Sequence, residues 1–396
     1  MSGIDIASNS ALLSVADKLD MQNIFLAAIA GKESELQIKD WENVQTIVRA
    51  GLAPKVFAVG DQLCCNHENY GELVWDIVGF DHDTPTDKNL THSMTLVLHN
   101  VLNKNAFDQS ERFFYAEDEL PAGTYNFPLP VGYNVNNGGN ANKEMIYSFT
   151  LENSVPKGGY LIISWEYGVN IKDAFIKSYM SDDTQIEVAA VSDAVDGGLE
   201  LKNIGSGINS ISRARFGSND YKSSAIRKWL NSNKTAGNWW SASYVFDRAP
   251  GYAKDAGFLA GLDKDFVSVI GKTQKTVYAD VSKNDLQVIT LNDYMFLLSS
   301  EEVYGSESNP PEGKPYDYFK IYSDNIEATN NTDSNRIKYY NGTAVQWNLR
   351  TPGISSYNNV DSFDSVVRSV IEDGSCSRMN YPYGTARGVV PACCII

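Results

Sequence analysis

The side chains that could do metal or acid–base chemistry are concentrated in one short stretch of the chain. All four histidines lie between His67 and His99, and the same stretch holds Asp81, Asp83 and Asp87. Imidazole and carboxylate groups are ligands for zinc and calcium, so this density is typical of a metal site. The spacing contains no His-x₃-His pair, however, and the aspartates lack the glycine and the bidentate glutamate of an EF-hand. We therefore predict a polar turn here and no bound metal ion.

The residues that could act as nucleophiles lack a base. Cys376, Cys393 and Cys394 are the candidates, but no histidine follows residue 99 to activate them. Adjacent carboxylates such as Glu301 and Glu302 diverge, whereas glycoside hydrolysis needs two carboxyl groups that face each other across the substrate. No G-x-S-x-G element, Walker loop or dinucleotide fingerprint is present. The sequence therefore predicts no catalytic residue, no cofactor and no enzymatic activity.

Binding is the chemistry that the C-terminal part of the chain favours. Between Asn325 and Asn359 there are eight asparagines, interleaved with tyrosines and serines. Tyrosine supplies rigid amphipathic contact area, and Asn and Ser supply adaptable hydrogen bonds, which is the composition of antibody binding surfaces. The alternative is an ordinary solvated loop, because Asn and Ser also form turns. The candidate ligand-binding residues are Tyr339, Tyr340, Asn341, Tyr357, Asn358 and Asn359.

A pair of tryptophans adds one more candidate. Trp239 and Trp240 are adjacent, and neighbouring side chains of a strand point to opposite faces. One of the two is therefore expected to be exposed, where its ring could stack on a sugar. We add Trp240 to the candidate ligand-binding residues.

Composition and charge exclude several classes of partner. Apolar residues make up 43% of the 396 residues, charged residues make up 21%, and the net charge is −16. Such a negative surface repels nucleic acid and anionic membranes. No apolar stretch approaches twenty residues, so no membrane insertion is expected. The N-terminal residues lack the basic region and apolar core of a secretory signal, and the five cysteines are an odd number, which argues against a disulfide framework.

The hydrophobic pattern divides the chain into four segments. Residues 1–54 are predicted to be helical, with more apolar positions around Leu12–Leu26 than one stripe can bury, which favours self-association or docking. Residues 55–168 hold runs of β-branched and aromatic residues separated by Gly, Pro and Asn, so we predict a mostly antiparallel β domain. Residues 169–207 connect this domain to a last domain, residues 208–396.

Two helices are predicted in more detail. The first runs from about Ile38 to Ala50, with Asp40 as the N-cap and Gly51 just after its end. The second, from His92 to Asn103, could be the one helix of the β domain, because its apolar residues form a compact run.

Four motifs in order resemble one family. They are S-x-I-R-x-W-L-N at residues 224–231, F-L-L-S-x-E-E-V at 296–303, W-x-L-R-T-P-G at 347–353 and G-V-V-P-A at 388–392. Together they resemble the C-type-lectin-like domains of uncharacterised gut bacterial and phage proteins, and of the variable proteins of diversity-generating retroelements. In the latter, variable positions near the C-terminus are biased to Asn, Tyr and Ser, as between Asn325 and Asn359.

The resemblance implies the fold class and two structural roles. It implies a C-terminal α+β domain, so we expect an α+β chain: a helical N-terminus, an antiparallel β domain and the lectin-like domain. It also implies that Trp347 lies in the core and that Arg350 ties loops to that core through hydrogen bonds.

The architecture as a whole resembles that of a tailed-phage virion protein. We expect a structural protein of the head or tail, a fibre or decoration protein, that binds a glycan or protein on the host surface. It would form a homo-oligomer, most simply a trimer, contact other virion proteins through residues 1–54, and assemble in the host cytoplasm. Two alternatives remain: an enzyme of the formylglycine-generating or glycan-cleaving type, and a bacterial surface carbohydrate-binding protein. The first lacks a catalytic constellation and the second lacks a signal peptide.

Overall fold

The protein is mostly β in structure. The computed structural model describes residues 40–129, 145–164, 174–201, 211–279, 287–305, 312–319, 335–353 and 366–396. Strands make up 39% and helices 14% of the described residues, so the predicted α+β class is wrong. The described helices are short, the longest being α2 (Trp41–Arg49), so β-sheets form the layers of the molecule. The predicted helical segment before residue 40 lies outside the described residues.

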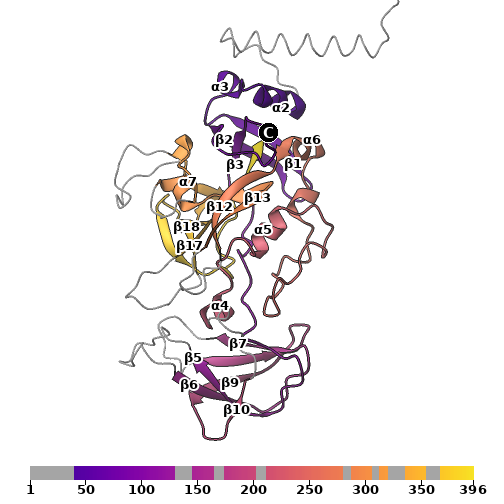
Figure 1. Cartoon of the computed structure of the whole chain (residues 1–396), viewed down its shortest axis with the longest axis vertical. Coiled ribbons are helices and arrows are strands. Elements are labelled where there is room, and N and C mark those ends of the chain that lie inside the picture. The colour runs from indigo at the N-terminus through magenta and orange to yellow at the C-terminus, as the bar shows by residue number, and fades with distance from the viewer. Residues whose placement is uncertain are drawn as a thin grey trace, which may run out of the picture.

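Two hydrophobic cores organise the described chain (Figure 1). The first core combines residues 44–107 with residues 221–396. The second core is built from residues 113–214 and lies at the opposite end of the molecule from α2. The second body is therefore an insertion into the first.

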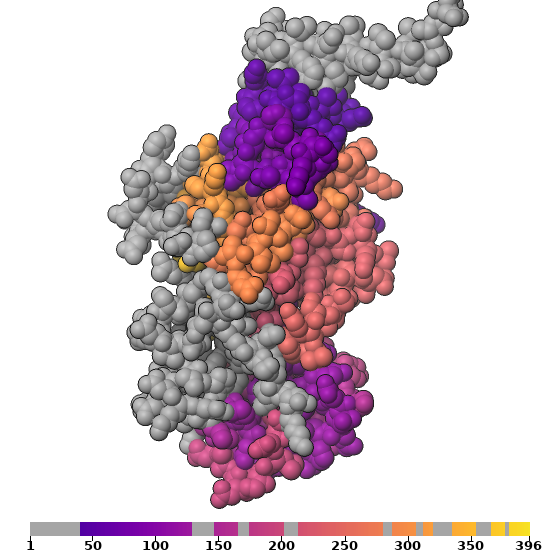
Figure 2. All heavy atoms as spheres, in the orientation of Figure 1, coloured from indigo at the N-terminus to yellow at the C-terminus, as the bar shows by residue number. Residues whose placement is uncertain are grey.

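The main sheet of the first core joins segments from both ends of the described chain. Its strand order is β1-β2-β3-β20-β11, with β14 also paired to β20, and every pair is antiparallel. The strands are β1 (Gln62–His67), β2 (Gly71–Phe80), β3 (Met94–Leu98), β11 (Ile270–Gly271), β14 (Met295–Leu297) and β20 (Pro391–Ile395). Figure 2 shows the result: the indigo and purple residues pack directly on the orange residues of the C-terminal half.

The C-terminal strand β20 is an interior strand of this sheet. It pairs with β3 on one side and with β11 and β14 on the other, and all five of its residues are buried. Cys393 and Cys394 are 0% exposed, which confirms that they are small buried residues of a terminal strand. The chain ends beside α2 (Figure 1), where the Gln45 side-chain amide donates to the Ile396 carbonyl at 2.7 Å.

The first helix has the predicted caps, and it runs from Trp41 to Arg49 within the predicted span of Ile38 to Ala50. The Asp40 carboxylate accepts a hydrogen bond from the backbone N–H of Asn43 at 2.8 Å, which caps α2. Gly51 follows the helix with φ +68°, a conformation that favours glycine at this position. Ile47 and Val48 form part of the buried face.

The predicted helix from His92 to Asn103 is wrong. This stretch forms strand β3, and all five of its residues are buried because β3 lies between β2 and β20. A short continuous apolar run does not distinguish a strand buried on both faces from a buried helix. The strand that pairs with β3 and makes it an interior strand lies almost 300 residues further along the chain, at Ala392–Ile395.

Smaller elements complete the first core around this sheet. They are α3 (Ala53–Val56), α5 (Ala225–Leu230), η3 (Phe258–Ala260), α6 (Lys264–Val269), α7 (Ser300–Tyr304), η4 (Asp317–Phe319), the hairpin β12 (Thr273–Ala279) and β13 (Gln287–Asp293), the hairpin β15 (Lys338–Tyr340) and β16 (Thr343–Val345), and the sheet β17 (Trp347–Gly353), β18 (Val366–Val370) and β19 (Cys376–Asn380).

The inserted body is one curled sheet. Its order is β10-β5-β6-β9-β8-β7-β4, antiparallel except for the short parallel pair of β10 with β5. The strands are β4 (Phe114–Tyr115), β5 (Gly123–Leu129), β6 (Met145–Leu151), β7 (Tyr160–Ser164), β8 (Phe175–Tyr179), β9 (Gln185–Asp193) and β10 (Leu199–Glu200).

The two cores group the segments differently from the predicted boundaries. The segment predicted as one β domain, residues 55–168, supplies β1–β3 to the first core and β4–β7 to the second. The segment predicted to be a connection, residues 169–207, contains strands β8–β10 of the second core. Strand-like sequences look alike in every sheet, and only long-range pairing assigns each strand to its partner.

The chain leaves the first body and returns to it at one place. Helix α4 (Ile211–Phe216) lies at the return, and the backbone N–H of Glu111 donates to the Ala214 carbonyl at 3.0 Å. The Arg213 guanidinium forms a buried ion pair with the Glu111 carboxylate at 2.6 Å. The two connections of the insertion are therefore fastened to each other.

Candidate functional site

The predicted binding residues begin with a tight hairpin. Strands β15 and β16 are joined by Asn341 and Gly342, and Tyr340 is paired with Thr343 across the turn. Both turn residues have positive φ, +51° and +78°. An Asn-Gly pair suits this turn, because Asn tolerates the left-handed conformation and Gly has no Cβ to oppose it. The hairpin therefore presents Tyr339 and Tyr340 from a rigid support.

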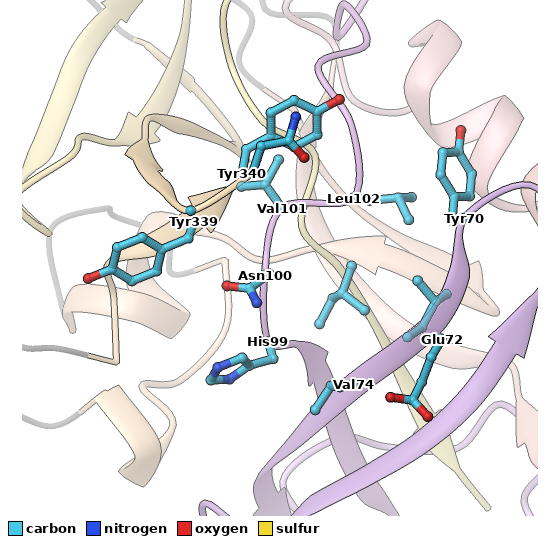
Figure 3. Close-up of a pocket in the computed structure, with 13 residues that line it drawn as sticks. Tyr70, Glu72, Val74, His99, Asn100, Val101, Leu102, Tyr339 and Tyr340 are labelled. Carbon is cyan, nitrogen blue, oxygen red and sulfur yellow. The ribbon is translucent and has the colours of Figure 1, made fainter.

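The hairpin forms one wall of a pocket of about 460 Å³. The remaining walls come from the start of β2 and from the segment that follows β3. In Figure 3, Tyr339 and Tyr340 lie on one side of residues 98–102, and Tyr70 and Glu72 lie on the other. The backbone N–H of Val101 donates to the Tyr339 carbonyl at 3.0 Å, which joins the hairpin to this segment.

The lining combines aromatic, apolar and polar groups. It consists of Tyr70, Glu72, Leu73, Val74, Leu98, His99, Asn100, Val101, Leu102, Tyr339, Tyr340, Asn341 and Gly342. Tyr339 is 46% exposed, whereas Tyr340 is half-buried, with the Lys104 ammonium over its ring at 5.3 Å from the centroid. The Tyr70 hydroxyl accepts a hydrogen bond from the Asn103 amide at 2.9 Å. Such a mixture of apolar surface and a few placed polar groups is typical of a ligand site.

A buried carboxylate behind the pocket connects its walls. Asp76, on β2, is 1% exposed. Its oxygens accept from the Gln62 amide of β1 at 2.9 Å, the Tyr318 hydroxyl of η4 at 2.8 Å and the Lys338 ammonium of β15 at 3.3 Å. Nδ1 of His99 lies 2.9 Å and 3.0 Å from the two oxygens. One side chain thus ties the hairpin, the sheet and the pocket histidine together.

The electrostatics keep Asp76 ionised. Burial by itself would raise the pKa of its carboxyl group, but the Lys338 ammonium and the hydrogen bonds from Gln62, His99 and Tyr318 outweigh burial and lower the pKa below its ordinary value. Burial also lowers the pKa of Lys338, and the Asp76 carboxylate opposes that shift. Asp76 and Lys338 therefore form a buried ion pair.

A pH dependence of stability follows from this lowered pKa. A carboxyl whose folded pKa lies below its unfolded value stabilises the fold above the unfolded value, which is about 4, and loses this contribution as the pH falls through the folded pKa. We expect Asp76→Asn to lower the free energy of unfolding by about 1–3 kcal/mol near neutral pH, because Lys338 loses its counter-charge. Urea unfolding from pH 7 to pH 3 should show this difference shrinking below about pH 4. A difference that stayed constant down to pH 3 would contradict it.

The structure brings together part of the predicted binding set. Tyr339, Tyr340 and Asn341 all line the pocket. Trp240 is half-buried against the first core and is not among the residues that line the pocket. Its neighbour Trp239 is buried, and its ring N–H donates to a backbone carbonyl. Neither tryptophan lies on a strand, so the alternation argument for an exposed ring does not apply. The remaining candidates, Tyr357, Asn358 and Asn359, lie outside the described residues.

Sequence reasoning missed the other half of the pocket. Tyr70, Glu72, His99 and Asn100 line it, although they lie some 240 residues before the hairpin. The Asn-Gly turn is a local signal, but no local signal indicates which distant segment packs against a hairpin. The β3–β20 pairing, which brings the two ends of the chain into one sheet, places them there.

The histidines are separated by the fold. His67 is buried and stacks on Phe258 at 5.0 Å, and burial lowers its pKa. His82 stacks on Tyr316, and His92 contacts the Asp81 carboxylate at 3.0 Å. Within the described ranges, no three His, Cys, Asp or Glu side chains are grouped so that they could hold a metal ion. His99 is the one that lines the pocket.

Another set of charged residues is buried within the first core. Arg350 is 0% exposed and holds the Glu302 carboxylate with both terminal nitrogens, at 2.5 Å and 3.0 Å. Lys275 forms ion pairs with Glu302 and Asp83. Trp347 is also 0% exposed, and its ring N–H donates to a backbone carbonyl at 2.9 Å. The structural roles expected of Trp347 and Arg350 are confirmed.

The helices offer no membrane span. Among the residues that the structure describes, no helix is both long and apolar enough to cross a bilayer.

One comparison with known proteins identifies a family. A family described as "Domain of unknown function (DUF6273)" matches residues 196–396, which is just over half of the 396 residues. No curated protein and no solved structure matches the chain. The matched range contains the hairpin wall of the pocket, whereas strands β1–β3 and the opposite wall precede it. From residue 196 to its last residue, the chain belongs to the DUF6273 family.

Proposed function

We propose that this protein is a receptor-binding protein whose DUF6273 domain binds a glycan in the pocket between the β15–β16 hairpin and residues 98–102. The observation that carries the proposal is the lining: three tyrosines beside Glu72, His99, Asn100 and Asn341. A sugar ring has apolar C–H faces and polar hydroxyls. Aromatic side chains pack against the C–H faces, and carboxylate, imidazole and amide groups form hydrogen bonds with the hydroxyls.

The charge of the pocket favours a neutral glycan. Among the described residues that line it, Glu72 is the one with a permanent charge, and no Lys or Arg takes part. Lys104 at the rim is directed over the Tyr340 ring. With a net charge of −16 on the chain, a phosphorylated or acidic sugar would be repelled. A neutral oligosaccharide is the ligand that fits.

Binding is better supported than catalysis. Hydrolysis of a glycoside needs two carboxyl groups placed on either side of the bond. Of the two carboxylates near the pocket, Asp76 is 1% exposed and neutralised by Lys338, so Glu72 would act without a partner. Burial raises the pKa of Cys394 to about 12, and it raises that of Cys393 as well. These thiols are therefore not reactive thiolates, which disfavours chemistry of the formylglycine-generating type.

The biological setting of the proposal is a tailed-phage particle. In it, the chain is a fibre or decoration protein of the head or tail that displays the DUF6273 domain toward the host surface. Residues 1–54 associate into a trimer or dock on other virion proteins, and assembly takes place in the host cytoplasm. The support for this setting is the resemblance of the four C-terminal motifs to lectin-like proteins of phages, together with the acidic composition.

Truncation of the exposed pocket tyrosine tests the proposal. Tyr339→Ala is expected to weaken binding by about 30-fold, because a tyrosine at an interface hot spot contributes roughly 2 kcal/mol. Binding would be measured on an array of neutral oligosaccharides and then, for those retained, by titration calorimetry. Tyr383→Ala is the matched control, since Tyr383 is 42% exposed but does not line the pocket. Equal affinity of Tyr339→Ala and the parent, or equal losses in the two variants, would refute this site.

A further inference from the structure

The two ring nitrogens of His99 have different surroundings. Its Nδ1 lies 2.9 Å and 3.0 Å from the two oxygens of Asp76. Its backbone N–H donates to the Val74 carbonyl at 2.8 Å, which fixes the residue at the end of β3. The side chain is 43% exposed and lines the pocket. Within the described part of the chain, Nε2 has no hydrogen-bond partner.

The environment of Asp76 determines which nitrogen of His99 carries the proton. An ionised carboxylate only accepts hydrogen bonds. Gln62, Tyr318 and Lys338 donate to its oxygens, and Nδ1 of His99 must do the same. The Gln62 amide nitrogen also lies 3.1 Å from Nδ1. With the ring proton on Nδ1, both nitrogens donate to the same oxygen, and this distance is a contact between neighbours.

The position of the ring proton decides what His99 offers to the pocket. When Nδ1 carries the proton, Nε2 is an acceptor. Glu72, on the neighbouring strand β2, also lines the pocket, and an ionised carboxylate is likewise only an acceptor. Two acceptors in one pocket suit a ligand that offers several O–H donors, and they disfavour a ligand that presents only acceptors.

We infer that Nε2 of His99 is the specificity-determining hydrogen-bond acceptor of this pocket, that Asp76 is the positioning residue that holds it in this state, and that the ligand is a polyhydroxylated sugar that donates a hydroxyl to Nε2. This inference rests on the proposed function for the class of ligand. It goes further in assigning the direction of the hydrogen bond and the residues that impose it.

The first test reads the tautomer directly and needs no ligand. Long-range ¹H–¹⁵N spectra of the full chain, labelled with ¹⁵N-histidine, distinguish a proton on Nδ1 from one on Nε2. The His99→Gln variant assigns the His99 signals by their disappearance. The expected spectrum shows the ring proton on Nδ1 and a lone pair on Nε2. A ring protonated on Nε2, or on both nitrogens, overturns the inference whatever the protein binds.

The second test compares variants on one sugar. The probe is the neutral oligosaccharide that the parent retains best on the array, used with its deoxy analogues. His99→Ala is expected to weaken binding about tenfold, the usual effect of losing one hydrogen bond, and His99→Gln to remain within about threefold, because the Gln amide oxygen is also an acceptor. One deoxy analogue should bind the parent about tenfold more weakly and bind His99→Ala no more weakly than the full sugar does.

The positioning role of Asp76 has its own variant. In Asp76→Asn the amide can donate to Nδ1, which moves the ring proton to Nε2 and turns the acceptor into a donor. We expect about a tenfold loss of affinity with His99 still in place, and a changed tautomer in the spectra. Should this variant fail to fold because Lys338 is left unpaired, Asp76→Asn combined with Lys338→Met removes both buried charges and gives the same readout.

The outcomes separate this inference from the proposed function. Glycan binding that is equally strong in His99→Ala, or that no deoxy analogue weakens, overturns the inference and leaves the proposed function in place. A parent protein that retains no oligosaccharide overturns the proposed function and the ligand assigned here, even if the tautomer is the expected one.

Discussion

A fragment that carries only residues 196–396 is expected not to fold, although it spans the whole family match. Its interior strand β20 would lose β3, its partner on one side. The fragment would also lose the first-core side chains of Trp75, Ile77 and Leu96, each 0% exposed in the full chain. Burial of one such large apolar side chain stabilises a fold by roughly 1.5–3 kcal/mol. The net stability of a folded protein is only about 5–15 kcal/mol, so the loss of several buried side chains is enough to unfold the fragment.

The measurement is thermal unfolding followed by circular dichroism, together with sedimentation. The fragment should show no cooperative unfolding transition and should aggregate. Co-expression with residues 40–107 should restore a cooperative transition. The matched control is a chain in which a short Gly-Ser linker replaces residues 113–210, so that α4 and the Arg213–Glu111 ion pair are kept. The ends of this insertion are joined by the 3.0 Å hydrogen bond between Glu111 and Ala214, and its core is separate, so this chain should fold. A fragment 196–396 that is monomeric and melts cooperatively would contradict the pairing of β3 with β20.

Replacement of Trp347 by alanine is expected to lower the free energy of unfolding by about 3–5 kcal/mol, the usual result of emptying a buried aromatic site. The ring is 0% exposed, and its N–H donates to the Arg336 carbonyl at 2.9 Å, so the variant loses packing and leaves that carbonyl without its donor. Urea unfolding should be followed by tryptophan fluorescence. The tryptophans among the described residues all belong to the first core or pack against it, so this signal reports mainly on that core.

The control for Trp347→Ala is Tyr339→Ala. Tyr339 is 46% exposed, and substitutions at such positions usually change stability by no more than about 0.5 kcal/mol. The two variants therefore separate the role of the W-x-L-R motif in the core from the role of the hairpin in binding. An unfolding curve of Trp347→Ala that coincides with that of the parent would contradict the assignment of Trp347 to the core.

The features predicted correctly from the sequence are those that depend on residues close together in the chain. The boundaries of α2 followed from Asp40 and Gly51, because a capping carboxylate and a C′ glycine act within one turn of the helix. The burial of Trp347 and Arg350 agrees with the interpretation of the W-x-L-R-T-P-G motif as part of a core. The predicted helix from His92 to Asn103 is wrong because the continuous apolar run Met94–Leu98 was interpreted without its sheet neighbours. The α+β class, which rests on a helical N-terminus and on the resemblance, is wrong because the described chain is mostly β.

The amino-acid sequence by itself determined the elements of the binding site that depend on adjacent residues: the Asn341-Gly342 turn, the tyrosines before it, and the acidic composition that disfavours anionic ligands. Only the tertiary structure decided that His99 and Glu72 line one pocket with this hairpin and that Asp76 holds the walls of the pocket together. The physical reason is that β-pairing has no local signature of its partner. A strand shows which of its faces is apolar, and the register that buries that face is decided when β3 and β20, almost 300 residues apart, form one sheet.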